Sequence, residues 1–308
     1  MNKISHLYLA LFLFFSTLMF AQETTESETT ETPGKQHPFK IGFYVGSYFA
    51  NKYTAGVYDG YGFDMDGVRI TNFEESWMNN KINFQYGGGN GQIDQIAQAL
   101  NVNPRNSPSP GWELFTKENM PVNMRYTASF LFGLQCRYSV DNKNAISLNV
   151  NASKLNVSGN FTITTIPPTG SSQINKSIQT FGIKGGEQRL MIQIGYNRLF
   201  GDNETINFFA EGGLNMTYSQ FDKNEILINN LKIDLTEFYD YQGIQSGYTK
   251  LPSGMGLGAY AGVGINIAMG EKFTIQLIYS PSYEGIKIGD KPTLNWQHSV
   301  GLRAYYNF

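Results

Sequence analysis

The last thirteen residues, from Trp296 to Phe308, alternate between two kinds of side chain with a period of two. Every second residue from Trp296 is aliphatic or aromatic except His298, and the residues between them are polar or small except Tyr305. A period of two is that of a β-strand with two unlike faces. This stretch therefore predicts a strand with an apolar environment on one side and a polar one on the other.

Seven earlier segments show the same alternation, so the chain is predicted to contain eight strands. The segments are residues 39–49, 124–140, 145–157, 188–199, 205–219, 255–268 and 273–283. Their polar faces carry glycines, amides, hydroxyls and a few charges. Charged residues make up only 16% of the chain, below the roughly 25% of soluble domains. A soluble barrel needs many Lys and Glu side chains outside, so we expect the apolar faces to meet lipid and the polar faces to line a narrow lumen.

Aromatic residues near both ends of the apolar faces are typical of the interfacial girdles of membrane barrels. One predicted girdle contains Phe39, Tyr138, Phe273, Tyr306 and Phe308, and the other contains Tyr126, Tyr218, Tyr283 and Trp296.

Short and long connections alternate between the predicted strands. The short ones are residues 141–144, 201–204 and 269–272, all rich in turn-forming residues. The long ones are about 50–123, 158–187, 220–254 and 284–295. Outer-membrane barrels have short periplasmic turns and long extracellular loops. We therefore expect an eight-stranded antiparallel transmembrane β-barrel with long structured extracellular loops and both termini in the periplasm.

The N-terminal region predicts export. Residues 1–21 carry Lys3 and an apolar run of about 14 residues, which is short for a membrane span and typical of a secretory signal peptide. Residues 22–37 are acidic and rich in Thr, and we expect a disordered spacer. Residues 38–308 then form the barrel. Cys136 is the only cysteine, so no intramolecular disulfide can form.

On these features the chain resembles the small outer-membrane β-barrels of Gram-negative bacteria, the OmpA-like and PorT-like group. The resemblance covers about residues 38–308. It implies that Tyr306 and Phe308 form the C-terminal signal that the barrel-insertion machinery recognises. Barrels of this group include anchors, adhesins, a few enzymes and accessory subunits, so the resemblance specifies location rather than activity.

Six charged residues share the predicted lumen face and form a predicted polar network. They are Lys40, Arg125, Arg137, Arg189, Glu211 and Arg303. Glu211 and Arg303 fall near the middle of their strands, so we expect them to pair across the interior. We interpret this network as structural rather than as an ion path.

The first outer loop, about residues 50–123, is far longer than the roughly 15 residues beyond which unstructured loops are uncommon. Its sequence predicts two short helical segments with apolar stripes, the first with capping-box logic at Asn72. The apolar residues of interest are Phe73, Trp77, Ile93, Ile96, Leu100 and Trp112. They predict either a lid folded onto the barrel or a surface for docking a partner.

The sequence offers no catalytic arrangement. Histidine occurs only at positions 6, 37 and 298, so neither a Ser-His-Asp triad nor a two-His metal site can be built in the barrel. Residues 64–67 resemble part of a calcium loop but lack its bidentate Glu. We therefore expect a non-enzymatic protein without metal or cofactor. The net charge of −2 argues against nucleic-acid binding.

Our leading hypothesis is an accessory or scaffold subunit of a larger outer-membrane complex for protein export, barrel insertion or nutrient uptake. It would dock through its outer loops or its lipid-facing wall. Its partners would be outer-membrane lipid, the insertion machinery and other outer-membrane proteins. The alternative is a free-standing surface protein whose loops bind an external ligand or surface.

Overall fold

The computed structural model describes residues 38–64, 66–83, 92–167, 175–201, 203, 205–239, 245–247, 252–270, 272–288 and 293–308. All of them belong to one compact unit, His37–Phe308. The calcium-like segment is therefore described except for Met65, while the predicted signal and spacer lie outside the described residues, as do residues 84–91.

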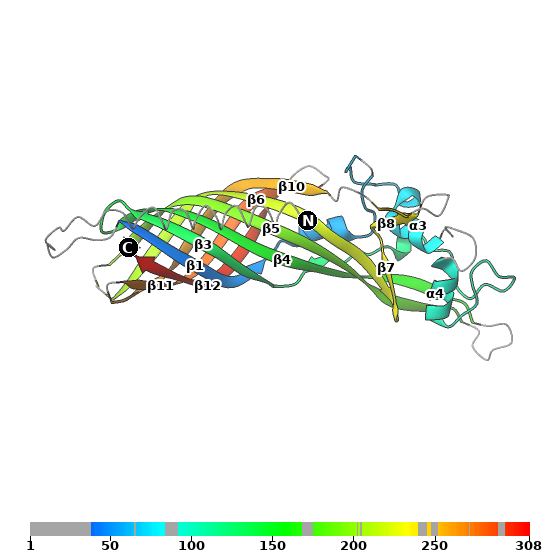
Figure 1. The fold of residues 1–308 in the computed structure, drawn as a ribbon. Helices are drawn as coiled ribbons and strands as arrows, with labels where there is room; N and C mark the ends of the chain where they lie inside the picture. The colour runs from blue at the N-terminus through cyan, green and yellow to red at the C-terminus, as the bar shows by residue number, and fades with distance from the viewer. Residues whose placement is uncertain are drawn as a thin grey trace. The chain divides into compact units, whose positions relative to one another are not determined.

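Eight antiparallel strands form a closed barrel (Figure 1). In order around the barrel they are β1 (Phe39–Phe49), β3 (Ser129–Ser139), β4 (Asn144–Thr165), β5 (Ser177–Phe200), β6 (Ile206–Ile228), β10 (Ser253–Met269), β11 (Phe273–Ile286) and β12 (Thr293–Asn307). The last strand pairs with the first, with Val45 opposite Leu302. The predicted fold class is thus confirmed, and each predicted strand corresponds to one barrel strand.

The two faces of the barrel wall differ as predicted. Large apolar side chains stand exposed on the outside, among them Leu214 at 73% and Phe208 at 67%. An apolar belt of this extent is stable only in contact with lipid. At its edges, the rings of Tyr283 and Trp296 lie 5.1 Å apart at one end, and those of Phe273 and Tyr306 lie 5.3 Å apart at the other. The barrel therefore spans a membrane between two aromatic girdles.

Three tight connections lie at one end of the barrel, between β3 and β4, β5 and β6, and β10 and β11. In the first, the Asp141 carboxylate accepts hydrogen bonds from the backbone N–H groups of Lys143 and Asn144, both at 2.8 Å. Gly201 and Gly270 have positive φ values of 102° and 73°, which glycine adopts readily in turns. The four remaining connections lie at the opposite, capped end, so the predicted alternation of short and long connections is confirmed.

Three strands at the capped end are much longer than predicted. β4, β5 and β6 have 22, 24 and 23 residues, against 11 in β1. Most of the predicted loop 158–187, and part of 220–254, is therefore strand. The reason lies in an exchange of polarity along β4, whose inward face changes from Ser153 to Leu155 and Val157 and whose outward face changes from Ala152 to Lys154. Because the prediction required one continuous apolar face, it ended the strand near this exchange of polarity.

A folded cap covers this end of the barrel. Its helical elements are α2 (Lys52–Ala55), η1 (Gly56–Tyr58), η2 (Phe73–Glu75), α3 (Trp77–Asn83), α4 (Gln92–Leu100) and η3 (Lys117–Asn119). Its short strands are β2 (Arg125–Tyr126), β7 (Leu231–Asp234), β8 (Glu237–Tyr239) and β9 (Gln245–Gly247). Among the residues that the structure describes, no helix has the length and apolar character needed to cross a membrane.

Local sequence explains the cap helices. Asn72 caps η2, because its side-chain oxygen accepts from the Glu74 N–H at 3.2 Å. The full capping box that the sequence predicts is not formed, because the Glu75 carboxylate accepts from the Asn72 side chain at 3.2 Å and not from its backbone N–H. In α4, Ile93, Ile96 and Leu100 recur at helical spacing and are buried on one face. The helix ends where Asn101 adopts a left-handed conformation with φ of 57°.

Candidate functional site

The middle of the lumen is crossed by a buried ion pair. Arg303 on β12 binds Glu211 on β6 with two parallel hydrogen bonds of 2.7 Å, and Asn197 on β5 donates a third bond to Glu211 at 3.3 Å. The predicted pairing of Glu211 with Arg303 is thus present. A bidentate arginine–carboxylate pair is both strong and geometrically specific.

Other side chains fill the space around this pair. Arg137 donates to Gln276 at 2.9 Å and lies 4.5 Å from the centre of the Tyr305 ring. Lys40 is half-buried near the end with the tight turns. Buried apolar residues complete the filling, namely Tyr44, Tyr48, Leu131, Leu155, Met191, Phe209 and Ile278. An eight-stranded barrel has room for packed side chains and little more.

Glycines allow this dense packing. A Cβ atom on Gly195 would lie 2.2 Å from the Tyr260 hydroxyl, and one on Gly264 would lie 2.7 Å from the Phe209 ring. Both glycines face the lumen, and Gly264 belongs to the Gly-rich β10. They let large side chains from neighbouring strands cross the interior.

A second buried network lies where the barrel meets the cap. Glu187 and Arg189 of β5 form an ion pair at 2.6 Å. Arg189 also donates to the hydroxyls of Tyr48 at 3.0 Å and of Thr54, a cap residue, at 3.1 Å. The hydroxyl of Tyr58, also in the cap, donates to Glu187 at 3.3 Å. The cap and the barrel are therefore joined by the same charged pair.

Two members of the buried polar set were missed by the sequence analysis. Glu187 and Glu284 fell in segments predicted as loops, yet both are fully buried in the barrel interior. The carboxylate of Glu284 accepts from Thr217 and Asn215, both at 2.6 Å. The sequence did contain a signal for Glu187. It precedes the lumen residue Arg189 by two positions, and residues two apart in a strand point to the same face.

The prediction was wrong for Arg125, whose side chain is exposed on β2 and not in the lumen. Tyr126 was predicted to face lipid, but it points inward and its hydroxyl binds Glu187. The physical reason is an interruption after β2, which pairs with β4 and is separated from β3 by Thr127 and Ala128. This break reverses the phase of the alternation within the predicted segment 124–140.

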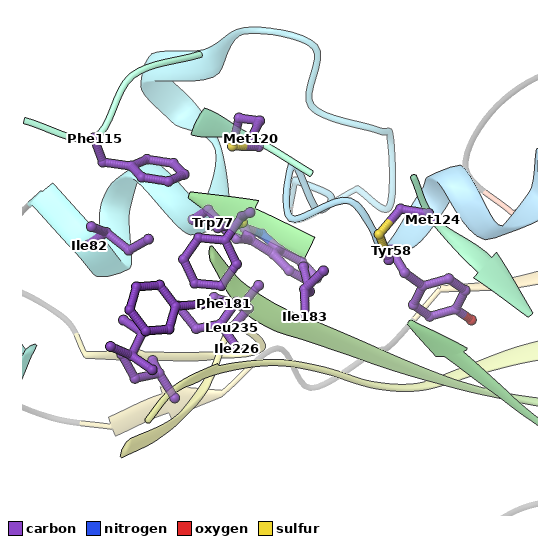
Figure 2. Close-up of a cluster of buried hydrophobic side chains, with 14 of the residues drawn as sticks. Tyr58, Trp77, Ile82, Phe115, Met120, Met124, Phe181, Ile183, Ile226 and Leu235 are labelled. Carbon is purple, nitrogen blue, oxygen red and sulfur yellow. The ribbon is translucent and has the colours of Figure 1, made fainter. Parts of the chain in front are cut away.

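The predicted partner-docking residues form the core of the cap instead of its surface. Trp77, Ile93, Ile96, Leu100 and Trp112 are all buried, and Phe73 packs against them while partly exposed. Figure 2 shows Trp77 and Ile82 packed with Phe181, Ile183 and Ile226 from the extended strands. Because these side chains are buried, they fit the predicted lid and not the predicted docking surface.

Both aromatic residues of the predicted insertion signal lie at the end of the barrel with the tight turns. The Tyr306 and Phe308 rings are 5.0 Å apart. The recognition role of Tyr306 and Phe308 stays a prediction.

On the lipid-facing wall, His298 is paired through Nδ1 with the Tyr279 hydroxyl at 2.8 Å.

Two acidic side chains of the cap take part in local structure. Asp64 accepts hydrogen bonds from the backbone N–H groups of Asp66 and Val68 at 2.9 and 2.8 Å, so its carboxylate stabilises a turn. Burial raises the pKa of Asp59 even though Arg69 pairs with it at 2.7 Å. Among the described residues, no three His, Cys, Asp or Glu side chains gather into a possible metal site.

A closed eight-stranded barrel with a lipid-facing belt, two aromatic girdles and a polar interior defines a transmembrane β-barrel protein of the outer-membrane type. No protein-family model matches the chain, and no curated protein matches it.

Solved structures of outer-membrane barrels are similar at low identity. Neisserial surface protein A is 8% identical, with 88% of this chain and 97% of that chain covered and a TM-score of 0.38. OprG from Pseudomonas aeruginosa is 12% identical, with 90% and 100% covered and a TM-score of 0.36. Ail of Yersinia pestis is 13% identical, with 88% and 97% covered and a TM-score of 0.35. The likeness is one of fold and carries nothing about ligands or partners.

Proposed function

We propose that this protein is a non-transporting accessory or scaffold subunit of a larger outer-membrane complex, with its cap outside the cell and both termini in the periplasm. The observation that carries this proposal is the continuity of buried side chains from the lumen into the cap. Glu187 and Arg189 bind Tyr58 and Thr54 across the junction, so the cap is a fixed extension of the barrel.

A filled lumen supports a role other than conduction. The Arg303–Glu211 pair crosses the barrel at its middle, and moving it aside would leave buried charges unpaired. We expect the purified protein to give no steady current in planar bilayers. A sustained open current would contradict both the structural role of the ion pair and the proposed function.

The contact surface must lie outside the cap core. Leu114 and Val122 are exposed apolar side chains of the cap, at 55% and 82%, and flank the buried residues Phe115 and Met120. The lipid-facing wall offers a second, larger apolar surface. Exposed apolar groups at the centre of an interface contribute most of its stability when they become desolvated.

A hollow in the cap favours the alternative function, in which the protein binds an external ligand. The hollow has a volume of about 300 Å³ and lies next to the C-terminal end of α4. Its lining residues include the polar Gln98, Asn101 and Asn103 and the apolar Val102 and Ile166. Such a mixture of polar and apolar groups suits a small neutral molecule.

Co-purification from mild detergent separates the two functions. The full chain would be tagged and extracted from outer membranes, and proteins present at near-equal stoichiometry would be identified. A stable set of outer-membrane proteins, lost from Leu114→Asp or Val122→Asp but kept by the conservative Leu114→Met, is the expected result. A lone barrel of its own mass would contradict the subunit proposal and favour the external-ligand alternative.

A further inference from the structure

Two cations of the lumen lie side by side at the end of the barrel that carries the tight turns. Lys40 on β1 is directly opposite Arg137 on β3. Directly opposed residues of neighbouring strands point to the same face, with Cβ atoms about 5 Å apart, and like charges there destabilise a sheet. Arg137 is only 4% exposed, while Lys40 is half-buried at the mouth of the lumen. The pair therefore needs a source of negative charge.

No carboxylate of the described residues supplies that charge by direct contact. Inside the described part of the barrel, Glu187 and Glu211 are paired with other arginines. Glu284 lies toward the capped end, where it accepts from two neighbouring polar side chains at 2.6 Å. Within the described ranges, neither Lys40 nor Arg137 forms an ion pair.

The row of opposed residues that passes through the two cations contains no acid either. Around the described barrel it runs through Asn307, Lys40, Arg137, Ser147, Gly195, Gly213 and Tyr260. Lys40 and Arg137 are the charged members of this row, so no neighbour along it neutralises them. A counter-ion for the pair must therefore come from solution.

The polar groups beside the two cations can donate hydrogen bonds to such an ion. Arg137 Nη2 donates to Gln276 at 2.9 Å and to the Tyr305 hydroxyl at 3.4 Å, while the buried Arg137 Nε has no protein partner. Buried donors without an acceptor are rare in folded proteins. The Tyr305 hydroxyl accepts from Arg137, so its own hydrogen is available to a ligand. Tyr305 is also a diagonal neighbour of Lys40, because Lys40 pairs with Asn307.

We propose that Lys40, Arg137 and Tyr305 bind a small monovalent anion of the size of chloride at this mouth of the lumen. Two cations and a hydroxyl supply charge of the required sign, and charge-assisted hydrogen bonds are the strong ones. The half-buried Lys40 leaves the site open to water, while Tyr305 and Gln276, 1% and 0% exposed, close it on the inner side. A bulky anion such as gluconate is therefore excluded.

The bound anion acts as a counter-ion and is not conducted. The ion pair at the middle of the lumen lies deeper than this site and blocks further passage. The proposal does not depend on the proposed subunit function.

The test compares variants of the full chain refolded in detergent, with chloride titrated against gluconate at constant ionic strength. Lys40→Gln/Arg137→Gln removes both cations, and Lys40→Gln alone changes the half-buried position only. Lys143→Gln/Arg198→Gln is the matched control, since it removes one Lys and one Arg that are exposed at the same end of the barrel. The line width of the chloride NMR signal measures binding. Heat-dependent gel mobility verifies that each variant is folded.

We expect the wild type to broaden the chloride signal by a saturable amount. Lys40→Gln should bind chloride about tenfold more weakly, the effect of removing one charged donor, and the double variant about a hundredfold more weakly. The control should stay within about twofold, because exposed charges are screened by solvent and salt. Chloride should also raise the urea midpoint of the wild type above its value in gluconate, and this difference should disappear in the double variant.

Three results would overturn the site: wild-type broadening that does not saturate, equal losses of binding in the double variant and the control, or an equal rise of the urea midpoint in all three proteins. Each of these is independent of the co-purification result, so the anion site and the subunit function can fail separately.

Discussion

Arg303 and Glu211 face each other across the barrel and share two hydrogen bonds of 2.7 Å, although 92 residues separate them in the chain. Both side chains are buried. A buried charge is stable only while its partner remains, so the pair links β12 to β6 through the interior as well as through the wall.

Replacing Glu211 by Ala is expected to destabilise the barrel by about 3–5 kcal/mol, because Arg303 would be buried without a counter-charge. Urea-induced unfolding in lipid vesicles measures this loss. The control is Glu211→Leu/Arg303→Met, which removes both charges and is expected to regain most of the lost stability. A double variant no more stable than Glu211→Ala would contradict this account of the pair.

Replacing Trp77 by Ala is expected to destabilise the cap by about 3–5 kcal/mol, because it leaves a cavity in a well-packed core. Trp77 is only 1% exposed, and its indole N–H donates to the Phe63 carbonyl at 3.1 Å. Limited proteolysis should cut the cap of this variant while the membrane-embedded strands stay protected. Val122→Ala, at an exposed position, should be cut no faster than the wild type.

The contact between Tyr58 and Glu187 is expected to hold the cap on the barrel. Tyr58→Phe removes a buried hydroxyl that donates at 3.3 Å and keeps the ring that stacks on Phe221 at 4.7 Å. A loss of about 1–2 kcal/mol in local opening is expected, because the Glu187 oxygen loses a donor. Hydrogen exchange of residues 52–58 measures it, and unchanged protection there would show that this bond is dispensable.

The carboxylate of Glu225 is expected to make stability depend on pH in the acid range. Burial opposes its charge, but hydrogen bonds from Lys232 and Lys223 outweigh that effect and lower the pKa of Glu225. A lowered pKa means that the stabilisation is present above the unfolded value, about 4.3, and disappears as pH falls through the folded value.

Glu225→Gln should therefore be less stable than the wild type at pH 7, by about 1 kcal/mol or less for a pair at the surface. The difference should shrink only below about pH 4. Thermal unfolding of both proteins between pH 3 and 7 measures this difference. A gap that stays constant over the whole range would show that the carboxylate charge is not its source.

By itself the sequence determined the class of fold, because a period of two reports locally which environment each face of a strand meets. β1 begins and ends where its alternation does, and the order of short and long connections follows from residues that are neighbours in the chain. The exchange of polarity beyond Ser153 is also present in the sequence, but it can be interpreted as a continuing strand only when the position of the membrane boundary is known. The break after Tyr126 likewise reverses the phase without any strong local signal.

Only the tertiary structure decided which side chains meet. The sheet closes on itself and brings Arg303 to Glu211, and the extended strands bury Trp77 and Trp112, which a local pattern left open as either lid or docking surface. The same closure buries Glu187 under the cap and leaves the Arg125 side chain exposed on the outer face. Such contacts depend on register and on closure, which are set by many weak interactions at long range and not by any one segment.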